Sequence, residues 1–333
     1  MSLYFHGYGE KGLPFQMILR ILFIHLFLFY ASQAQSMFGD NNQCKWEEKN
    51  PMITSRSEFS TLTEEENIYV LGGIRGSKAL SNFEVYNSIT DTWKKISSLP
   101  ISVHHGAIGL VNNKIYLIGG FTDVTWQKPN KYVFEYDIPN DSWTKYDELL
   151  ITRVGHTLEI IDNQIFIIGG HGYKPSRILK YNLKKKKIIE IESMMPSPAD
   201  HFASIVYKND IIILGGRNES GNLNIIRIFK LEKNQWLYNN SLPFSNSGHI
   251  AEIANSKIHI AGGEDIGKNV TSKAHWIFDI KKNKWEKSID LPLGLHGLGS
   301  GVVNNKLYIF GGASEAGQKT YNSTQNKIYL FKC

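Results

Sequence analysis

A glycine pair that recurs six times, at intervals of 46–50 residues, constrains the fold of this chain more than any other feature. Each pair ends a short apolar run, such as NIYVLGG, KIYLIGG or KLYIFGG, and each run follows a turn-like sequence such as VNNK. Short strands and glycine turns at this period are typical of a β-propeller, in which each repeat forms one blade of four strands. The pairs therefore predict an all-β, six-bladed propeller; they lie at residues 72–73, 119–120, 169–170, 215–216, 262–263 and 311–312.

Most glycine pairs are followed by an aromatic residue and, seven residues later, by a tryptophan. The four pairs of this kind are Tyr86–Trp93, Tyr136–Trp143, Phe229–Trp236 and Phe278–Trp285. The third repeat departs from the pattern, because Ile188 stands seven residues after Tyr181. The Gly-Gly…Tyr…Trp pattern resembles the Kelch repeat, and the resemblance covers almost all of residues 35–333, which we expect to form the propeller.

The two ends of the propeller are expected to complete one blade together. The sequence NKIYLFKC supplies a third strand after the last glycine pair, and CKWEE supplies the missing fourth strand. When both are aligned on the first repeat, Cys44 and Cys333 fall at the two ends of a tight outer turn. Such ends lie within about 7 Å, and a disulfide joins Cα atoms roughly 4.4–6.8 Å apart. We therefore predict a Cys44–Cys333 disulfide that closes the ring, with two free thiols as the alternative.

Residues 1–34 have the pattern of a signal peptide. Arg20 precedes the apolar run ILFIHLFLFYA, and Ser32-Gln33-Ala34 offers small residues for cleavage. Met17 is a possible true start, because it would give a leader of more usual length. We expect an exported protein, periplasmic or extracellular, that has no transmembrane anchor after cleavage. An oxidising compartment also permits the disulfide.

Histidines gather just before the first strand of the repeats. Counted back from the first glycine of each pair, positions −15 to −13 hold His104, His105, His156, His201, His249 and His296. The second strand of a blade returns to the face where the first begins, so this window and the residues after Gly-Gly should meet around one channel mouth. Hydrogen bonds between blades are the alternative role for such histidines. The candidate ligand-binding residues at this mouth are Arg56, Glu58, His156, His171, Arg217, His249, Glu264 and His296.

Strand alternation indicates which of these side chains face the channel. Small residues such as Ala107, Gly109 and Ala203 occupy even positions of the first strand, as a crowded axis requires. By the same parity, the side chains at position −14, which include Glu58, His105 and His201, should point toward the channel. Position −10 places two further acids deeper inside it. The candidate acid–base residues are Glu159, Glu252, His105 and His201.

Two functions fit these residues. One is binding of a small molecule, a glycan or an exported protein at the mouth, by a chain that we expect to be a monomer. The other is sugar chemistry, since the architecture, length and leader resemble the exported Kelch N-acetylneuraminate mutarotases. That resemblance implies an isomerase that uses His and Glu as acid and base, although the long insertion of that family is missing here.

Metal chemistry is the weaker alternative. His105, His201 and either Glu58 or His156 could supply ligands, but no HxH or HExxH spacing supports a metal site, so no cofactor is predicted. A copper radical oxidase on this fold needs a Tyr–Cys crosslink, and neither cysteine is expected near the mouth. The net charge of +6 is modest, and no phosphate loop or nucleic-acid motif occurs.

Overall fold

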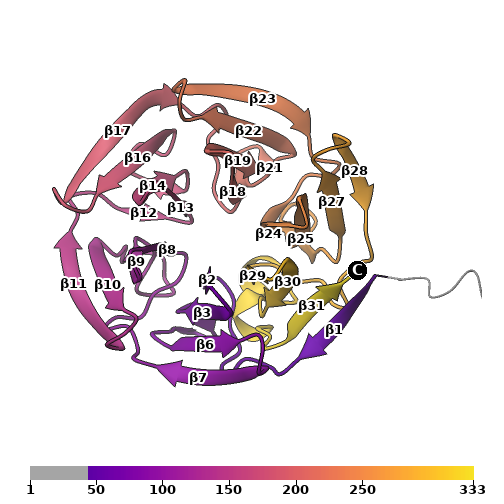
Figure 1. Ribbon diagram of the computed structural model, residues 1–333, viewed down its shortest axis with the longest axis horizontal. Helices are drawn as coiled ribbons and strands as arrows, with labels where there is room; N and C mark the ends of the chain where they lie inside the picture. Colours follow the sequence, from indigo (N-terminus) through magenta and orange to yellow (C-terminus); the bar gives the residue numbers. More distant parts are fainter. Residues whose placement is uncertain (1–43) are drawn as a thin grey trace, which may run out of the picture. The chain divides into compact units, whose positions relative to one another are not determined.

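The computed structural model describes residues 44–333, so the predicted leader at 1–34 and its possible start at Met17 lie outside the described residues. Six antiparallel sheets, each with four main strands, are arranged in a ring, which confirms the six-bladed propeller (Figure 1). Within residues 44–333, a 3-10 segment, η1 (Gly317–Asn322), is the only helical element. No helix among the described residues is long and apolar enough to cross a membrane.

Each of the first five blades is built from consecutive strands, ordered from the channel outward. Their bounds are β2 (Ser60–Glu64), β3 (Asn67–Leu71), β6 (Phe83–Asn87) and β7 (Thr92–Ile96) in blade one; β8 (Ala107–Val111), β9 (Lys114–Ile118), β10 (Tyr132–Asp137) and β11 (Ser142–Glu148) in blade two; β13 (Thr157–Ile161), β14 (Gln164–Ile168), β16 (Arg177–Asn182) and β17 (Lys187–Met194) in blade three; β18 (Ala203–Tyr207), β19 (Asp210–Leu214), β22 (Ile225–Lys230) and β23 (Gln235–Ser241) in blade four; and β24 (Ser247–Ala254), β25 (Lys257–Asp265), β27 (His275–Asp279) and β28 (Lys284–Lys287) in blade five.

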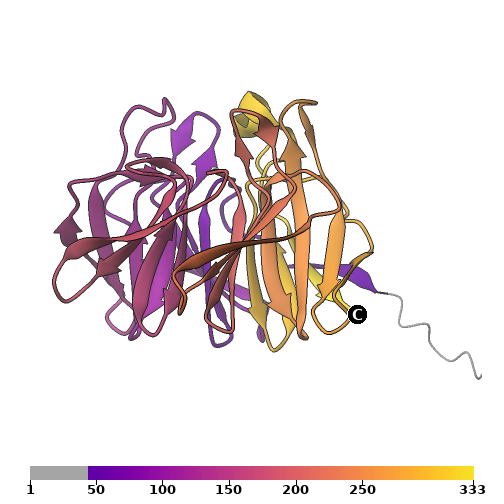
Figure 2. The same cartoon turned by 90° about the horizontal axis from the view of Figure 1, so that it is seen from above.

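Short strands extend the loops after the glycine pairs, and one of them, in blade three, pairs with a short strand that precedes the innermost strand. They are β4 (Ile74–Arg75) with β5 (Lys78–Ala79), β12 (Arg153–Val154) with β15 (His171–Gly172), β20 (Arg217–Asn218) with β21 (Gly221–Asn222), and β26 (Val270–Thr271) on β25. Figure 2 shows η1 at the face of the ring toward which several of these loops extend. This face carries the mouth considered below.

Blade six is completed by both ends of the described chain. The strands β29 (Gly299–Val303), β30 (Lys306–Phe310) and β31 (Ile328–Lys332) are followed by β1 (Lys45–Lys49), which pairs with β31 and places Trp46 opposite Phe331. Cys44 and Cys333 form a disulfide at this closure. The predicted ring closure and disulfide are therefore confirmed.

The glycine pairs are needed where neighbouring blades approach each other closely. At Gly119 and Gly120, φ is +68° and +86°, a region that L-residues with a side chain rarely occupy. A Cβ on Gly119 would lie 2.1 Å from the carbonyl oxygen of Arg153 in the next blade. A larger residue would therefore separate the two blades.

Apolar side chains of adjacent blades form the core. Leu71 and Phe83 of blade one, for example, pack in one cluster with Leu117 and Phe134 of blade two. The outer strands add a second connection, because the Trp143 indole N–H donates a hydrogen bond of 2.7 Å to the Ser97 carbonyl of blade one.

The outer strands of blade three keep this connection by another route. Ile188 stands opposite Tyr181, in the place that a tryptophan occupies in the other blades. Here Tyr146 of blade two donates its hydroxyl to the Leu183 carbonyl at 2.9 Å. In this hydrogen bond the donor lies in the earlier blade and the acceptor in the later one, the opposite of the Trp143–Ser97 bond, and the propeller geometry is retained.

Candidate functional site

A water-accessible cavity of about 270 Å³ runs into the channel from the η1 face. Its wall is formed by the starts of the innermost strands of all six blades. The upper level includes Glu58, His105 and His201, and the lower level includes Glu159 and Glu252. These five predicted residues lie along one channel, as the alternation of the strands indicated.

Successive residues at position −14 form a backbone ring at the mouth, in which hydrogen bonds make five of the six links. The N–H of His105 donates to the Glu58 carbonyl at 3.1 Å, and the N–H of Gly155 donates to the His105 carbonyl at 2.9 Å. Similar bonds link Gly248 to His201 and Gly297 to Gly248. This bonding holds all six residues in the left-handed region, with φ between 50° and 63°.

Three of the six blades use glycine at this position, and the other three use Glu58, His105 and His201. A side chain in the left-handed region costs about 1–2 kcal/mol, a penalty that glycine avoids. The backbone ring therefore explains the unusual conformation, but it does not explain why three blades carry large polar side chains there.

These three side chains converge. His105 Nε2 lies 3.1 Å from Glu58 Oε2 and 3.1 Å from His201 Nε2. Burial, followed by the nearby charge of His201, holds the pKa of His105 well below its usual range. The opposite side of the His201 ring contacts the Asp200 carboxylate through Nδ1.

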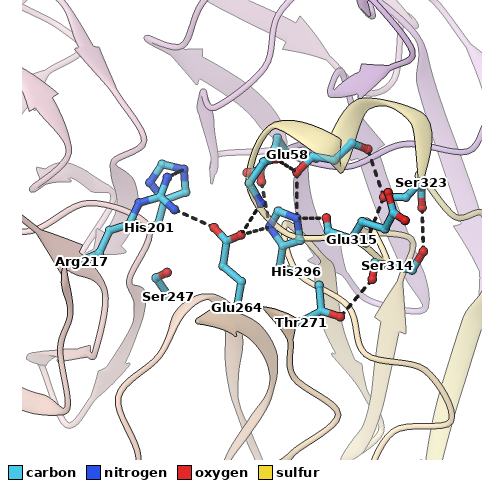
Figure 3. Close-up of polar contacts among 12 residues, drawn as sticks. Glu58, His201, Arg217, Ser247, Glu264, Thr271, His296, Ser314, Glu315 and Ser323 are labelled. Carbon is cyan, nitrogen blue, oxygen red and sulfur yellow. Dashed lines mark hydrogen bonds and ion pairs between the residues drawn. The ribbon is translucent and has the colours of Figure 1, made fainter. Parts of the chain in front are cut away.

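The remaining polar groups of the mouth connect Arg217 to Glu58 through Glu264 and His296 (Figure 3). Arg217 donates to Glu264 at 2.6 Å and to Asp200 at 3.2 Å. His296 Nδ1 lies 3.5 Å from both Glu264 and Glu58. With the contacts of His105 and His201, these groups form a closed circuit, and five blades contribute the residues named here.

An exposed aromatic side chain stands over the histidines. Trp126, in the loop between β9 and β10, is 41% exposed, and its ring centroid lies 4.5 Å from that of His105. Its indole N–H donates to the Tyr321 hydroxyl of η1 at 2.9 Å. The tryptophan side chain therefore offers an apolar ring face at the rim of an otherwise polar mouth.

The lower level of the channel holds two acids that burial keeps easy to protonate. Ser204 donates to Glu159, and Ser300 donates to Glu252 at 2.8 Å. Burial raises the pKa of each carboxyl to about 7, although the side chains keep some access to water inside the channel. Both can therefore exchange a proton near neutral pH.

Some predicted ligand-binding residues lie elsewhere. Arg56 is fully buried away from the channel, 2.6 Å from the buried Glu84, and it donates to the Gly72 carbonyl. Its expected place at the mouth is therefore wrong, because a carboxylate inside the blade holds the guanidinium.

His156 and His249 border the cavity, but their rings are buried between blades. The His156 ring lies against Gly119 of blade two, and the His249 ring lies against Gly215 of blade four. Burial lowers the pKa of His156 to about 3 and that of His249 to about 4. His171, by contrast, is exposed at the rim, 2.6 Å from Asp200, and this hydrogen bond raises its pKa.

Several residues of the site were not predicted. Ser204 and Ser300 occupy an odd position and still reach the two buried acids, because the innermost strands of neighbouring blades lie side by side and each serine points toward the strand of the preceding blade. Trp126 lies in a loop without a strand pattern. Its signal in the sequence is its position after the second glycine pair, outside the repeated aromatic–tryptophan pattern.

Comparison with known proteins agrees with this architecture. A model of the KLHDC2/KLHL20/DRC7 Kelch-repeats domain matches residues 105–312, and a Kelch motif matches residues 55–100. The chain belongs to the Kelch-repeat family. This Kelch propeller is 29% identical to Kelch-like protein terF of Aspergillus terreus over 63% of the chain and 50% of that protein. It is 26% identical to mouse Kelch-like protein 38 over 62% of the chain and 35% of that protein. The propeller thus spans half or less of these relatives.

Proposed function

We propose that this chain is an exported Kelch propeller that binds a polar ligand at the channel mouth. The ligand is a small molecule, a glycan or a polar segment of an exported protein. The observation that carries the proposal is the closed circuit of charged and polar side chains around a water-accessible opening. Burying charged groups is costly even when they are paired with one another. Contact with a ligand would account for keeping so many of them at this mouth.

The mouth has complementary features for such a ligand. Arg217 can grip a carboxylate with two parallel hydrogen bonds, and it is only partly buried. The exposed Trp126 ring can cover an apolar face of a sugar or side chain. Export is supported by the predicted leader and by the disulfide, which persists in oxidising compartments.

A thermal-shift screen tests this proposal with sugars, sialic acid, amino acids and short peptides. A ligand at 100 times its dissociation constant should stabilise the fold by about 2.7 kcal/mol. Arg217→Ala should abolish the shift, whereas Lys282→Ala, on an outer turn, should leave it unchanged. The proposal fails if no compound shifts the melting temperature, or if both variants respond as the wild type does.

Sugar-acting acid–base catalysis is a second candidate, and it is favoured by one observation. The two channel acids, Glu159 and Glu252, have pKa values raised to about 7, which suits proton transfer near neutral pH. An NMR assay of anomer exchange in N-acetylneuraminate and other sugars tests it. Exchange faster than the buffer rate, lost in Glu159→Gln and in Glu252→Gln, supports an isomerase; buffer rates throughout refute it.

A further inference from the structure

The three side chains at position −14 bring their lone pairs together. Glu58, His105 and His201 each offer one ligand atom, and these atoms lie within 4.8 Å of one another. The two shorter separations, both 3.1 Å, start at His105 Nε2. The protons of this group follow from the hydrogen bonds on the opposite sides of the two imidazole rings.

His105 has its proton on the side away from the mouth. His104 Nε2 lies 2.7 Å from the Asp123 carbonyl, which can only accept, so His104 carries its proton on Nε2. His104 Nδ1 is then an acceptor, and it lies 2.6 Å from His105 Nδ1. His105 Nδ1 must therefore donate, which leaves the lone pair of His105 Nε2 directed at Glu58 and His201.

His201 is oriented in the same way by other partners. Its Nδ1 faces the Asp200 carboxylate, which can only accept, so Nδ1 carries the proton and donates the hydrogen bond. An Nη2 of Arg217, which can only donate, lies 3.1 Å from His201 Nε2. The His105 Nε2 lone pair and the Glu58 Oε2 oxygen therefore face each other without a proton between them, whereas the His201 Nε2 lone pair accepts from Arg217, a bond that an ion at this position would displace. A cation between His105 and Glu58 would relieve the contact between their two acceptor atoms.

We propose that Glu58, His105 and His201 bind a divalent transition-metal ion of the zinc type at the channel mouth. Tetrahedral zinc at about 2.0–2.1 Å from each ligand places ligand atoms roughly 3.3 Å apart, close to both separations of 3.1 Å. The third side, between Glu58 and His201, is wider but stays within 4.8 Å, so ion binding requires the Glu58 carboxylate to move toward His201. Two imidazoles and one carboxylate are a donor set that suits zinc.

The surroundings of the three ligands support an ion. The His201–Asp200 contact and the His105–His104 contact fix each ring through its second nitrogen, as the outer partners of metal-bound histidines do. The carboxylates of Glu58, Asp200 and Glu264 outnumber the single guanidinium of Arg217 in the circuit. A divalent ion would balance this excess of negative charge.

The ion also explains why three blades depart from glycine at position −14. The backbone ring needs only the left-handed conformation, which Gly155, Gly248 and Gly297 adopt without strain. The three strained residues are the three ligands. An ion held by them keeps a fourth coordination position for the ligand at the mouth. This inference deepens the proposed function and rests on it for that fourth contact.

Zinc titration of the purified protein, first stripped with EDTA, tests the site by calorimetry. We expect one equivalent of Zn²⁺ to bind. His105→Gly and His201→Gly, which copy the residue of three other blades, should weaken binding about 100-fold or more, and Asp200→Asn about 10–100-fold. Lys282→Ala, on an outer turn, should bind as the wild type does. Circular dichroism and melting curves establish that each variant is folded.

Cobalt gives a readout that does not depend on the variants. Co²⁺ bound to the wild type should show the intense visible absorption of a four-coordinate site and should be displaced by Zn²⁺. The inference is overturned if the wild type binds no stoichiometric zinc, if folded glycine variants bind it equally, or if cobalt gives only the weak spectrum of the hydrated ion. Repeating the ligand screen in EDTA tests the proposed function without the ion.

Discussion

The disulfide that joins the two ends of the propeller should be a major part of its stability. Cys44 and Cys333 close a loop of about 290 residues. Loop-closure entropy for this length corresponds to about 5–6 kcal/mol at 25 °C, because the crosslink restricts the unfolded chain. A denatured chain that is already compact reduces this value. We therefore expect Cys44→Ser/Cys333→Ser to lower the free energy of unfolding by about 3–5 kcal/mol.

Guanidinium denaturation, followed by tryptophan fluorescence, measures the effect. The wild type in dithiothreitol is the matched control, and it should unfold at the same midpoint as the double variant. Hydrogen exchange should show β1 opening first in both, since β1 then depends only on its pairing with β31 and on the packing of Trp46 against Phe331. A change below about 1 kcal/mol, or unaltered exchange in β1, would refute the reasoning.

Three further predictions concern residues inside the blades. Arg56→Leu should cost about 3–5 kcal/mol in denaturation, because it leaves a buried carboxylate without its partner, and folded protein should keep any mouth ligand. Tyr146→Phe should cost about 1 kcal/mol, since the Leu183 carbonyl loses the shorter of its two hydrogen bonds, the one from blade two; an unchanged midpoint would contradict this. Glu159→Gln/Glu252→Gln should stabilise the protein by about 1–3 kcal/mol at pH 8 and little at pH 5, as denaturation at both values can check.

The sign of the last prediction follows from the raised pKa values. In the folded protein each carboxyl keeps its proton up to about pH 7. In the unfolded chain the same carboxyl loses its proton near pH 4.5. The stabilising contribution of the protonated form is therefore present below pH 4.5 and is lost as the pH rises toward 7. A double variant that is equally stable relative to the wild type at pH 5 and pH 8 would contradict this account.

The sequence pattern was sufficient for the blades and for the closure of the ring. The period of the glycine pairs predicted six sheets because each pair fixes a close contact between blades. The alignment of CKWEE with the fourth strand predicted both the partner of β31 and the disulfide. Parity predicted that Glu159 and His105 would line one channel, since alternation follows from strand geometry alone.

Contacts between distant side chains were harder to predict. Arg56 lies close to the histidine window in sequence, but its direction is decided by Glu84, which the repeat pattern does not single out. The tautomers of His105 and His201 depend on the Asp123 carbonyl and the Asp200 carboxylate, and only the folded ring brings these together. Trp126 was missed because its loop carries no strand periodicity.

A crystallographic soak tests the central claim most directly, because it shows where ligands bind on the whole surface. Crystals of the wild type would be exposed to a set of monosaccharides, amino acids and small carboxylates. The account predicts that bound density gathers at the channel mouth, in contact with Arg217, Glu264 or Trp126. Ligands that occupy the outer strands or the opposite face, and leave an open mouth empty, would contradict it.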